Sequence, residues 1–155
     1  MDYRAVKSQF RQKGTITIKD SRGTTFQWFS PKDPNMPHTG VYLIHEVFQL
    51  QALAGSFSEV ALDIVEYSAD KVIFHSPPAP GINGRVNSGG LIKFALIKSP
   101  FWHRLLFELR DTVEMQWVEK SGEIPFLAQE AFPLHFSETE TMELHADGRV
   151  KTRKA

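Results

Sequence analysis

The hydrophobic and polar positions at the two ends of the chain predict β-hairpins. Residues 15–19 (TITIK) and 24–29 (TTFQWF) are rich in β-branched and aromatic residues, and the DSRG stretch between them contains turn formers. Near the carboxyl end, residues 141–145 and 149–153 flank Asp147-Gly148, a pair typical of a type I′ turn. We therefore expect one hairpin close to each end of the sequence.

Two further hairpins are predicted in the middle of the chain. Residues 59–67 (EVALDIVEY) partly alternate and are followed, after a Ser-Ala-Asp turn, by the apolar residues 71–75. Residues 114–120 and 126–136 flank Ser-Gly-Glu, and a proline in the second segment indicates an edge or bulged strand. Residues 91–97 (LIKFALI) form a short apolar run that periodicity alone leaves open between a strand and a helix.

Helical periodicity occurs in three places. Near the amino end, Tyr3, Val6 and Phe10 recur at helical spacing and predict one or two turns. Residues 41–54 follow the apolar recurrence of a helix face and precede a glycine stop, although the β-branched and aromatic opening VYLI leaves a strand open. Ser99 and a proline at the next position predict the start of a helix over residues 100–111.

Together these elements predict an α+β fold, with a mainly antiparallel sheet built from hairpins and about two helices packed on it. The length of 155 residues fits a single domain over residues 1–155. A hydrophobic fraction of 41%, with twelve Phe and three Trp, is that of a chain that can build a core by itself.

Charge and cysteine content narrow the classes of function. Eighteen basic residues balance eighteen acidic ones, so no overall field attracts polyanions, and we expect no nucleic-acid partner. The sequence has no cysteine, which excludes disulfides and thiolate chemistry and is typical of a reducing compartment. No apolar run is long enough to span a bilayer, so the sequence predicts a cytoplasmic protein without a membrane span.

The most distinctive segment is residues 77–90 (PPAPGINGRVNSGG), which holds three prolines and four glycines. Loops of this length are more typical of binding elements than of plain connectors. Its glycines could expose backbone N–H groups to an anion, with charge from an arginine and hydrogen bonds from asparagine side chains. The predicted ligand-binding residues are Asn83, Arg85, Asn87, Ser88, Gly89 and Gly90.

Catalytic and metal motifs are absent from the sequence. The segment lacks the phosphate-loop spacing, and no serine occupies a nucleophile elbow. None of the six histidines forms an i, i+4 pair; His45-Glu46 lacks a second histidine because position 49 is Gln49. We therefore predict no catalytic residue, no metal ligand and no cofactor, while a metal site assembled from distant segments stays open.

The order DIVEYSADKVIFHSPPAPGINGRVNSGGLIKFALIKS from residue 63, followed by TVEMQWVEKSGEIPFLAQEAF, resembles hotdog-fold acyl-thioesterases. The resemblance implies that Asn83 matches the family's loop asparagine. It also implies that Gly89 and Gly90 stand at the head of a central helix and polarise a thioester carbonyl. Ser88 stands where the family usually has a histidine, so hydrolysis by this chain would lack that residue.

Three hypotheses of function follow. The leading one is a non-enzymatic binding or accessory domain with an apolar pocket or surface beside residues 77–90, taking a small apolar or acidic ligand. The second is a hotdog-like enzyme acting on a small acyl-thioester or an aromatic acid. The third is a subunit that pairs with another protein or with a second copy of itself.

Overall fold

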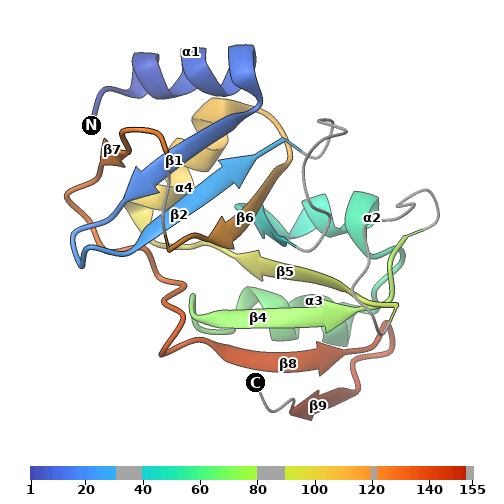
Figure 1. The fold of residues 1–155 in the computed structure, drawn as a ribbon. Coiled ribbons are helices and arrows are strands. Elements are labelled where there is room, and N and C mark those ends of the chain that lie inside the picture. Colours follow the sequence, from blue (N-terminus) through green and yellow to red (C-terminus); the bar gives the residue numbers. More distant parts are fainter. Residues whose placement is uncertain (31–39, 80–89, 120–121, 153–155) are drawn as a thin grey trace.

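The computed structural model describes residues 1–30, 40–79, 90–119 and 122–152. Within them the chain forms helices and nine strands that belong to one sheet (Figure 1). The helices are α1 Tyr3–Lys13, the 3₁₀ turn η1 Val47–Gln49, α2 Leu50–Leu53, α3 Glu59–Glu66 and α4 Pro100–Leu109. The strands are β1 Thr15–Lys19, β2 Thr25–Phe29, β3 Val41–Ile44, β4 Val72–Ser76, β5 Ile92–Leu96, β6 Val113–Trp117, β7 Phe126–Leu127, β8 Glu140–Leu144 and β9 Val150–Thr152.

The sheet is mixed, with the strand order β7-β1-β2-β6-β3-β5-β4-β8-β9. The pairs β1–β7, β3–β5 and β4–β8 are parallel, and the other neighbouring pairs are antiparallel. The α+β class is thus confirmed, but the sheet is less uniformly antiparallel than predicted. More helices form than the predicted two, because short apolar segments between the strands also fold as helical turns.

Helices cover both faces of the sheet. On β3, Val41 and Leu43 pack in a core with side chains of α1 and α4, whereas Tyr42 and Ile44 pack in a second core with α2 and α3. Successive side chains of a strand point to opposite faces, so the two cores lie on opposite sides of the sheet. In Figure 1, α1 and α4 accompany β1 and β2, and α3 accompanies β4.

Both terminal hairpins are confirmed. β1 and β2 pair antiparallel from Thr15↔Phe29 to Lys19↔Thr25. β8 and β9 pair antiparallel across a turn in which Gly148 has a φ of 96°, a left-handed value that glycine adopts without strain.

The first and the last predicted helices are also confirmed. α1 extends beyond the one or two turns expected, because Asp2 caps it with hydrogen bonds from the N–H groups of Arg4 and Ala5. α4 starts at Pro100, as Ser99-Pro100 indicated. Ser99, however, does not cap the helix with its side chain: both its N–H and its hydroxyl donate to Asp70 Oδ2, at 2.7 and 2.5 Å.

Three local predictions are wrong. Residues 41–54 do not form one helix, because VYLI is strand β3, buried on both faces, and only the later part is helical. Residues 59–67 do not form a strand, because residues 59–66 are helix α3: Ser58 Oγ accepts from the Ala61 N–H, and Ala61 and Val65, one turn apart, are buried. Residues 126–136 do not pair with β6, since β7 is a short edge strand beside β1.

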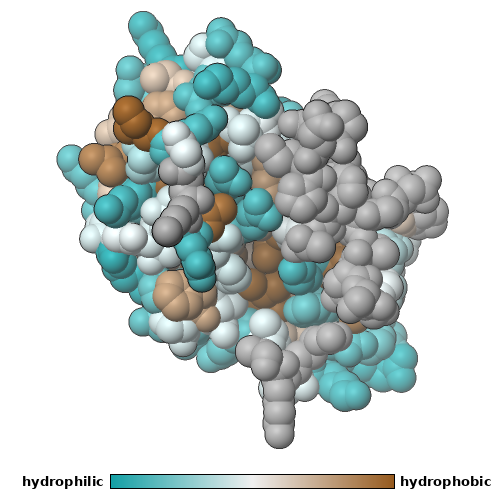
Figure 2. All heavy atoms as spheres, in the orientation of Figure 1, coloured by the Kyte–Doolittle hydropathy of each residue, from teal (hydrophilic) through white to brown (hydrophobic). Residues whose placement is uncertain are grey.

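The hotdog resemblance is wrong as well. Residue 63 lies in a helix, and Gly90 is followed by strand β5 instead of a central helix. For residues 91–97, periodicity did not separate a strand from a helix; residues 92–96 form strand β5, and Ile97 lies just beyond the end of this strand. None of the helices in the described residues is long and apolar enough to cross a membrane. The face shown in Figure 2 is largely hydrophilic, with a hydrophobic area near strand β5.

Candidate functional site

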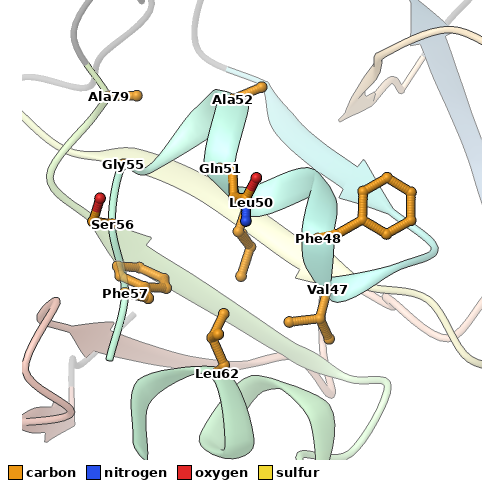
Figure 3. A pocket seen from close by; sticks show the side chains of 10 residues that line it. All are labelled: Val47, Phe48, Leu50, Gln51, Ala52, Gly55, Ser56, Phe57, Leu62 and Ala79. Atoms are coloured by element: carbon orange, nitrogen blue, oxygen red, sulfur yellow. The ribbon is translucent and has the colours of Figure 1, made fainter. Parts of the chain in front are cut away.

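A cavity of about 720 Å³ lies beside α2 on the sheet face that carries α2 and α3. In Figure 3 the side chains of Leu50, Phe57 and Leu62 point toward its centre, whereas the ring of Phe48 points away from them. In the part of the chain that the structure describes, ten residues line this α2 pocket: Val47, Phe48, Leu50, Gln51, Ala52, Gly55, Ser56, Phe57, Leu62 and Ala79. A volume of this size is within the usual range for small-molecule sites.

The fold holds the walls of the α2 pocket at several points. Leu50 and Leu53 anchor α2 in the core, with exposed fractions of 1% and 5%. The Ala79 N–H donates to the Leu53 carbonyl at 2.8 Å, which fixes the chain after β4 against α2. Phe57 contacts Phe94 of β5, with ring centroids 6.3 Å apart. The pocket is therefore bounded by helix α2, the Phe57 ring that packs on β5, and Ala79 of the proline-rich segment.

The described residues give the α2 pocket a neutral lining. None of its ten lining residues is charged, and its polar side chains are Gln51 and Ser56. Phe48 is 68% exposed and offers an aromatic ring to solvent at the rim. Such a lining suits an uncharged, partly aromatic group that needs a small number of hydrogen bonds.

Most of the site residues predicted from sequence lie outside the described residues: Asn83, Arg85, Asn87, Ser88 and Gly89. Gly90 is described and exposed; its φ is 76°, and a Cβ placed there would meet no atom within 4 Å. Ala79 connects this prediction to the cavity, because it lines the α2 pocket and directly precedes residues 80–89 in the chain.

A second candidate site is a cluster of two histidines and a glutamate, one of which is far from the other two in the sequence. His45 and Glu46 follow β3, and His103 lies in the first turn of α4; one ligand atom from each lies within 4.8 Å of the others. Burial is the main cause that lowers the pKa of His45, and the nearby His103 adds to it, while Glu46 acts in the opposite direction. In the sequence, His45-Glu46 has no second histidine at the metal-site spacing, and no local pattern indicates His103, which only the packing of α4 brings close.

On the sheet face opposite α1 and α4, strands β1, β2 and β6 carry a row of polar side chains. Gln27 Nε2 donates to Thr17 Oγ1 at 3.5 Å, and Gln116 Nε2 donates to Gln27 Oε1 at 3.3 Å, forming a row across three strands. Glu114 of β6 is fully buried. Its carboxylate raises the pKa of Lys93, although burial of that ammonium group is the larger effect and lowers the pKa overall.

The strand order and the helices on both faces define a class of fold found in known structures, and the chain is similar to several solved proteins. By sequence it matches no protein-family model and no curated protein. By structure it is similar to E. coli YciO, with a TM-score of 0.70, 12% identity, and coverage of 98% of this chain and 87% of that one. It is also similar to P. abyssi Sua5, with a TM-score of 0.68, 12% identity and coverage of 92% of this chain. The match spans 50% of the Sua5 chain.

A third similar structure is full-length HypF in its phosphate- and nucleotide-bound form, with a TM-score of 0.66 and 9% identity. This match covers 97% of the present chain and 28% of HypF. P. abyssi Sua5 has also been solved in complex with L-threonine. At these identities the comparisons establish the fold.

The comparisons overturn one prediction. The balanced charge led us to expect no nucleic-acid partner, yet this fold occurs in a protein solved with a bound nucleotide. The physical reason is that overall charge governs long-range attraction to polyanions, whereas a single nucleotide is held by local contacts in a pocket. Charge balance therefore does not exclude ligands of the nucleotide type.

Proposed function

We propose that this chain binds a small molecule of the nucleotide class, with the base in the α2 pocket and the phosphate at the segment of residues 80–90. The observation that carries the proposal is the neutral cavity of about 720 Å³, one wall of which, Ala79, leads directly into that segment. The similarity of fold to HypF, solved with phosphate and nucleotide, supports the same ligand class.

The α2 pocket has the chemistry that a nucleobase needs. Phe57 points toward the centre of the cavity and offers a ring for stacking (Figure 3). The Gln51 amide and the Ser56 hydroxyl can each donate and accept, which matches the mixed edge of a base. Leu50 and Leu62 supply apolar surface around the ring.

The phosphate needs a partner outside this lining, because the ten lining residues carry no charge. A dianion buried without a partner would cost far more than stacking returns. Arg85 supplies a guanidinium group, and Ser88, Gly89 and Gly90 supply N–H groups at the other end of the same segment. Base and phosphate would thus be recognised by two different parts of the chain.

Calorimetric titration of the full chain with adenosine, AMP and inorganic phosphate tests this division. Ala52 is an exposed residue of α2 that lines the pocket, so Ala52→Trp would add a large ring to the pocket wall without disturbing the core. We expect this variant to bind adenosine and AMP about tenfold or more weakly, since most of the buried base surface would be lost. Arg85→Ala should lower the affinity for AMP and phosphate and leave the affinity for adenosine unchanged.

Ala5→Trp is the matched control, because Ala5 is likewise an exposed helical alanine but lies on α1. Equal effects of the two tryptophan variants, or no binding of any nucleotide by the parent chain, would refute the assignment. L-threonine belongs in the same titration series, because a protein of this fold has been solved with it.

A further inference from the structure

From the side chains at the end of β3 and the start of α4 we infer a second site, which takes a divalent transition-metal ion, with zinc as the best match. Its ligands are His45, Glu46 and His103. The site is separate from the proposed nucleotide pocket, although Val47 lines both cavities.

The geometry is close to that of a metal centre. Glu46 Oε1 lies 3.7 Å from His103 Nε2, and one ligand atom from each of the three residues lies within 4.8 Å of the others. Ligand atoms about 2.0–2.1 Å from a tetrahedral zinc ion are roughly 3.3 Å apart, so a contraction of up to about 1.5 Å would close the site. Glu46 and His103 have side chains exposed by 52% and 37%, so both have room to move by that amount.

His45 has a ring nitrogen that can serve as a metal ligand. Its Nδ1 is buried and has no hydrogen-bond partner among the described residues. In the tautomer with the proton on Nε2, this nitrogen presents an unused lone pair, which is the feature that a metal ion requires. The rings of His45 and His103 meet edge to face, with centroids 5.5 Å apart, so both imidazoles border the same small volume.

Gln49 positions two of the three ligands. Its Oε1 accepts the N–H of His45 at 2.8 Å and the N–H of Glu46 at 3.0 Å. One side chain therefore fixes the backbone of adjacent ligands, in the manner of the outer residues that orient metal ligands in known sites.

The surroundings leave a coordination position open. A cavity of about 300 Å³ is lined by the three ligands together with Val47, Glu66, Leu96 and Lys98. Lys98 donates to the Ser68 carbonyl, which holds its ammonium group. Glu66 adds a carboxylate to the lining. Two histidines, one carboxylate and an open fourth position form a set that binds zinc in proteins.

Titration of the full, tag-free chain with Zn²⁺ against a chromophoric chelator tests the site, with Co²⁺ absorption as a report on coordination geometry. We expect one equivalent of Zn²⁺ to bind, and we expect His103→Ala and Glu46→Gln each to lower the affinity for Zn²⁺ by about tenfold or more. Gln49→Ala should lower this affinity by about 10-fold, because the variant keeps all three ligands but loses the side chain that positions two of them.

The control is His145→Ala. His145 also lies beside a carboxylate, with its Nε2 3.4 Å from Glu143 Oε1, but it is not among the three clustered ligands. Its loss should leave the bound equivalent unchanged. Absence of stoichiometric binding, or binding that persists in His103→Ala and Glu46→Gln alike, would overturn the inference. Far-ultraviolet circular dichroism of each variant separates loss of ligands from loss of fold.

Discussion

Asp20, in the turn between β1 and β2, connects that turn to a distant segment of the chain. Its Oδ1 accepts the N–H groups of Arg22 and Thr24, both at 3.0 Å, and its Oδ2 accepts the N–H of Phe132 at 2.9 Å. The Arg22 guanidinium donates to the Phe132 carbonyl at 2.7 Å, so Phe132 is held from both sides. We predict that Asp20→Ala is strongly destabilising.

The magnitude follows from these contacts. The Asp20 side chain is 1% exposed, so water cannot replace it as an acceptor without opening the structure. A buried N–H left without a partner costs about 1–3 kcal/mol, and hydrogen bonds to a charged acceptor contribute about 1.5–3 kcal/mol each. With partial relaxation of the turn, we expect a loss of about 4 kcal/mol, or roughly 8–16 °C in melting temperature for a chain of this length.

Urea unfolding at equilibrium measures this loss, and two variants make the result specific. Asp20→Asn keeps one acceptor oxygen and should fall between the parent and Asp20→Ala. Asp147→Ala removes a similar turn contact, with the Arg149 N–H at 3.0 Å, but this carboxylate is exposed and should matter far less. If Asp20→Ala and Asp147→Ala destabilise equally, or if Asp20→Ala costs less than about 1 kcal/mol, the reasoning from burial is wrong.

Three further predictions concern turns and helix ends. Gly148→Ala should lower the free energy of unfolding by about 2 kcal/mol or more, because φ is 96° and a Cβ would lie 2.7 Å from Val60 Cγ1. Gly122→Ala is the control and should change stability little, because a Cβ there would meet no atom within 4 Å. The urea midpoints of the two variants make the comparison. Asp70→Ala should cost about 1–2 kcal/mol, since the Ser99 N–H and hydroxyl lose their acceptor, and an unchanged midpoint would exclude this contact as a stabiliser of α4. The hydrogen bond from the Arg149 N–H is the main cause that lowers the pKa of Asp147. The ionised carboxylate therefore stabilises the fold above the usual carboxyl pKa, and this stabilisation is lost as the pH falls through the lower pKa of the folded state. The difference in melting temperature between the parent and Asp147→Asn at pH 7 should therefore shrink as the pH falls into the acid range, and a constant difference would contradict it.

The sequence could predict elements whose signals are local. The β1–β2 and β8–β9 hairpins follow from their turn residues, and the start of α4 follows from Ser99 and Pro100, even though Ser99 acts through Asp70. The helix α3 also had a local signal that the alternating pattern hid, namely a capping serine before an apolar i, i+4 pair.

The candidate sites were less accessible to sequence reasoning. Of residues 77–90, Ala79 lines the α2 pocket, so the segment and the cavity adjoin in the chain; ligand binding by residues 83–90 stays a prediction. The rest of that pocket comes from η1, α2, the connection that contains residues 55–57, and α3, and the sequence pattern predicted a strand where α3 forms. His103 joins His45 and Glu46 only through the packing of α4, so no spacing in the chain could indicate it.

The α+β class, the terminal hairpins and the helix at residue 100 are predictable from the sequence, because turn residues and caps act over a few neighbours. Only the packing of the assembled chain sets which strands pair, makes VYLI a strand, and brings distant side chains into one site. VYLI is apolar at every position and fits a helix or a strand equally well until helices cover both faces of the sheet. Burial on both sides is a property of the assembled layers, and therefore only the folded chain could select β3 and bring His45 and Glu46 to His103.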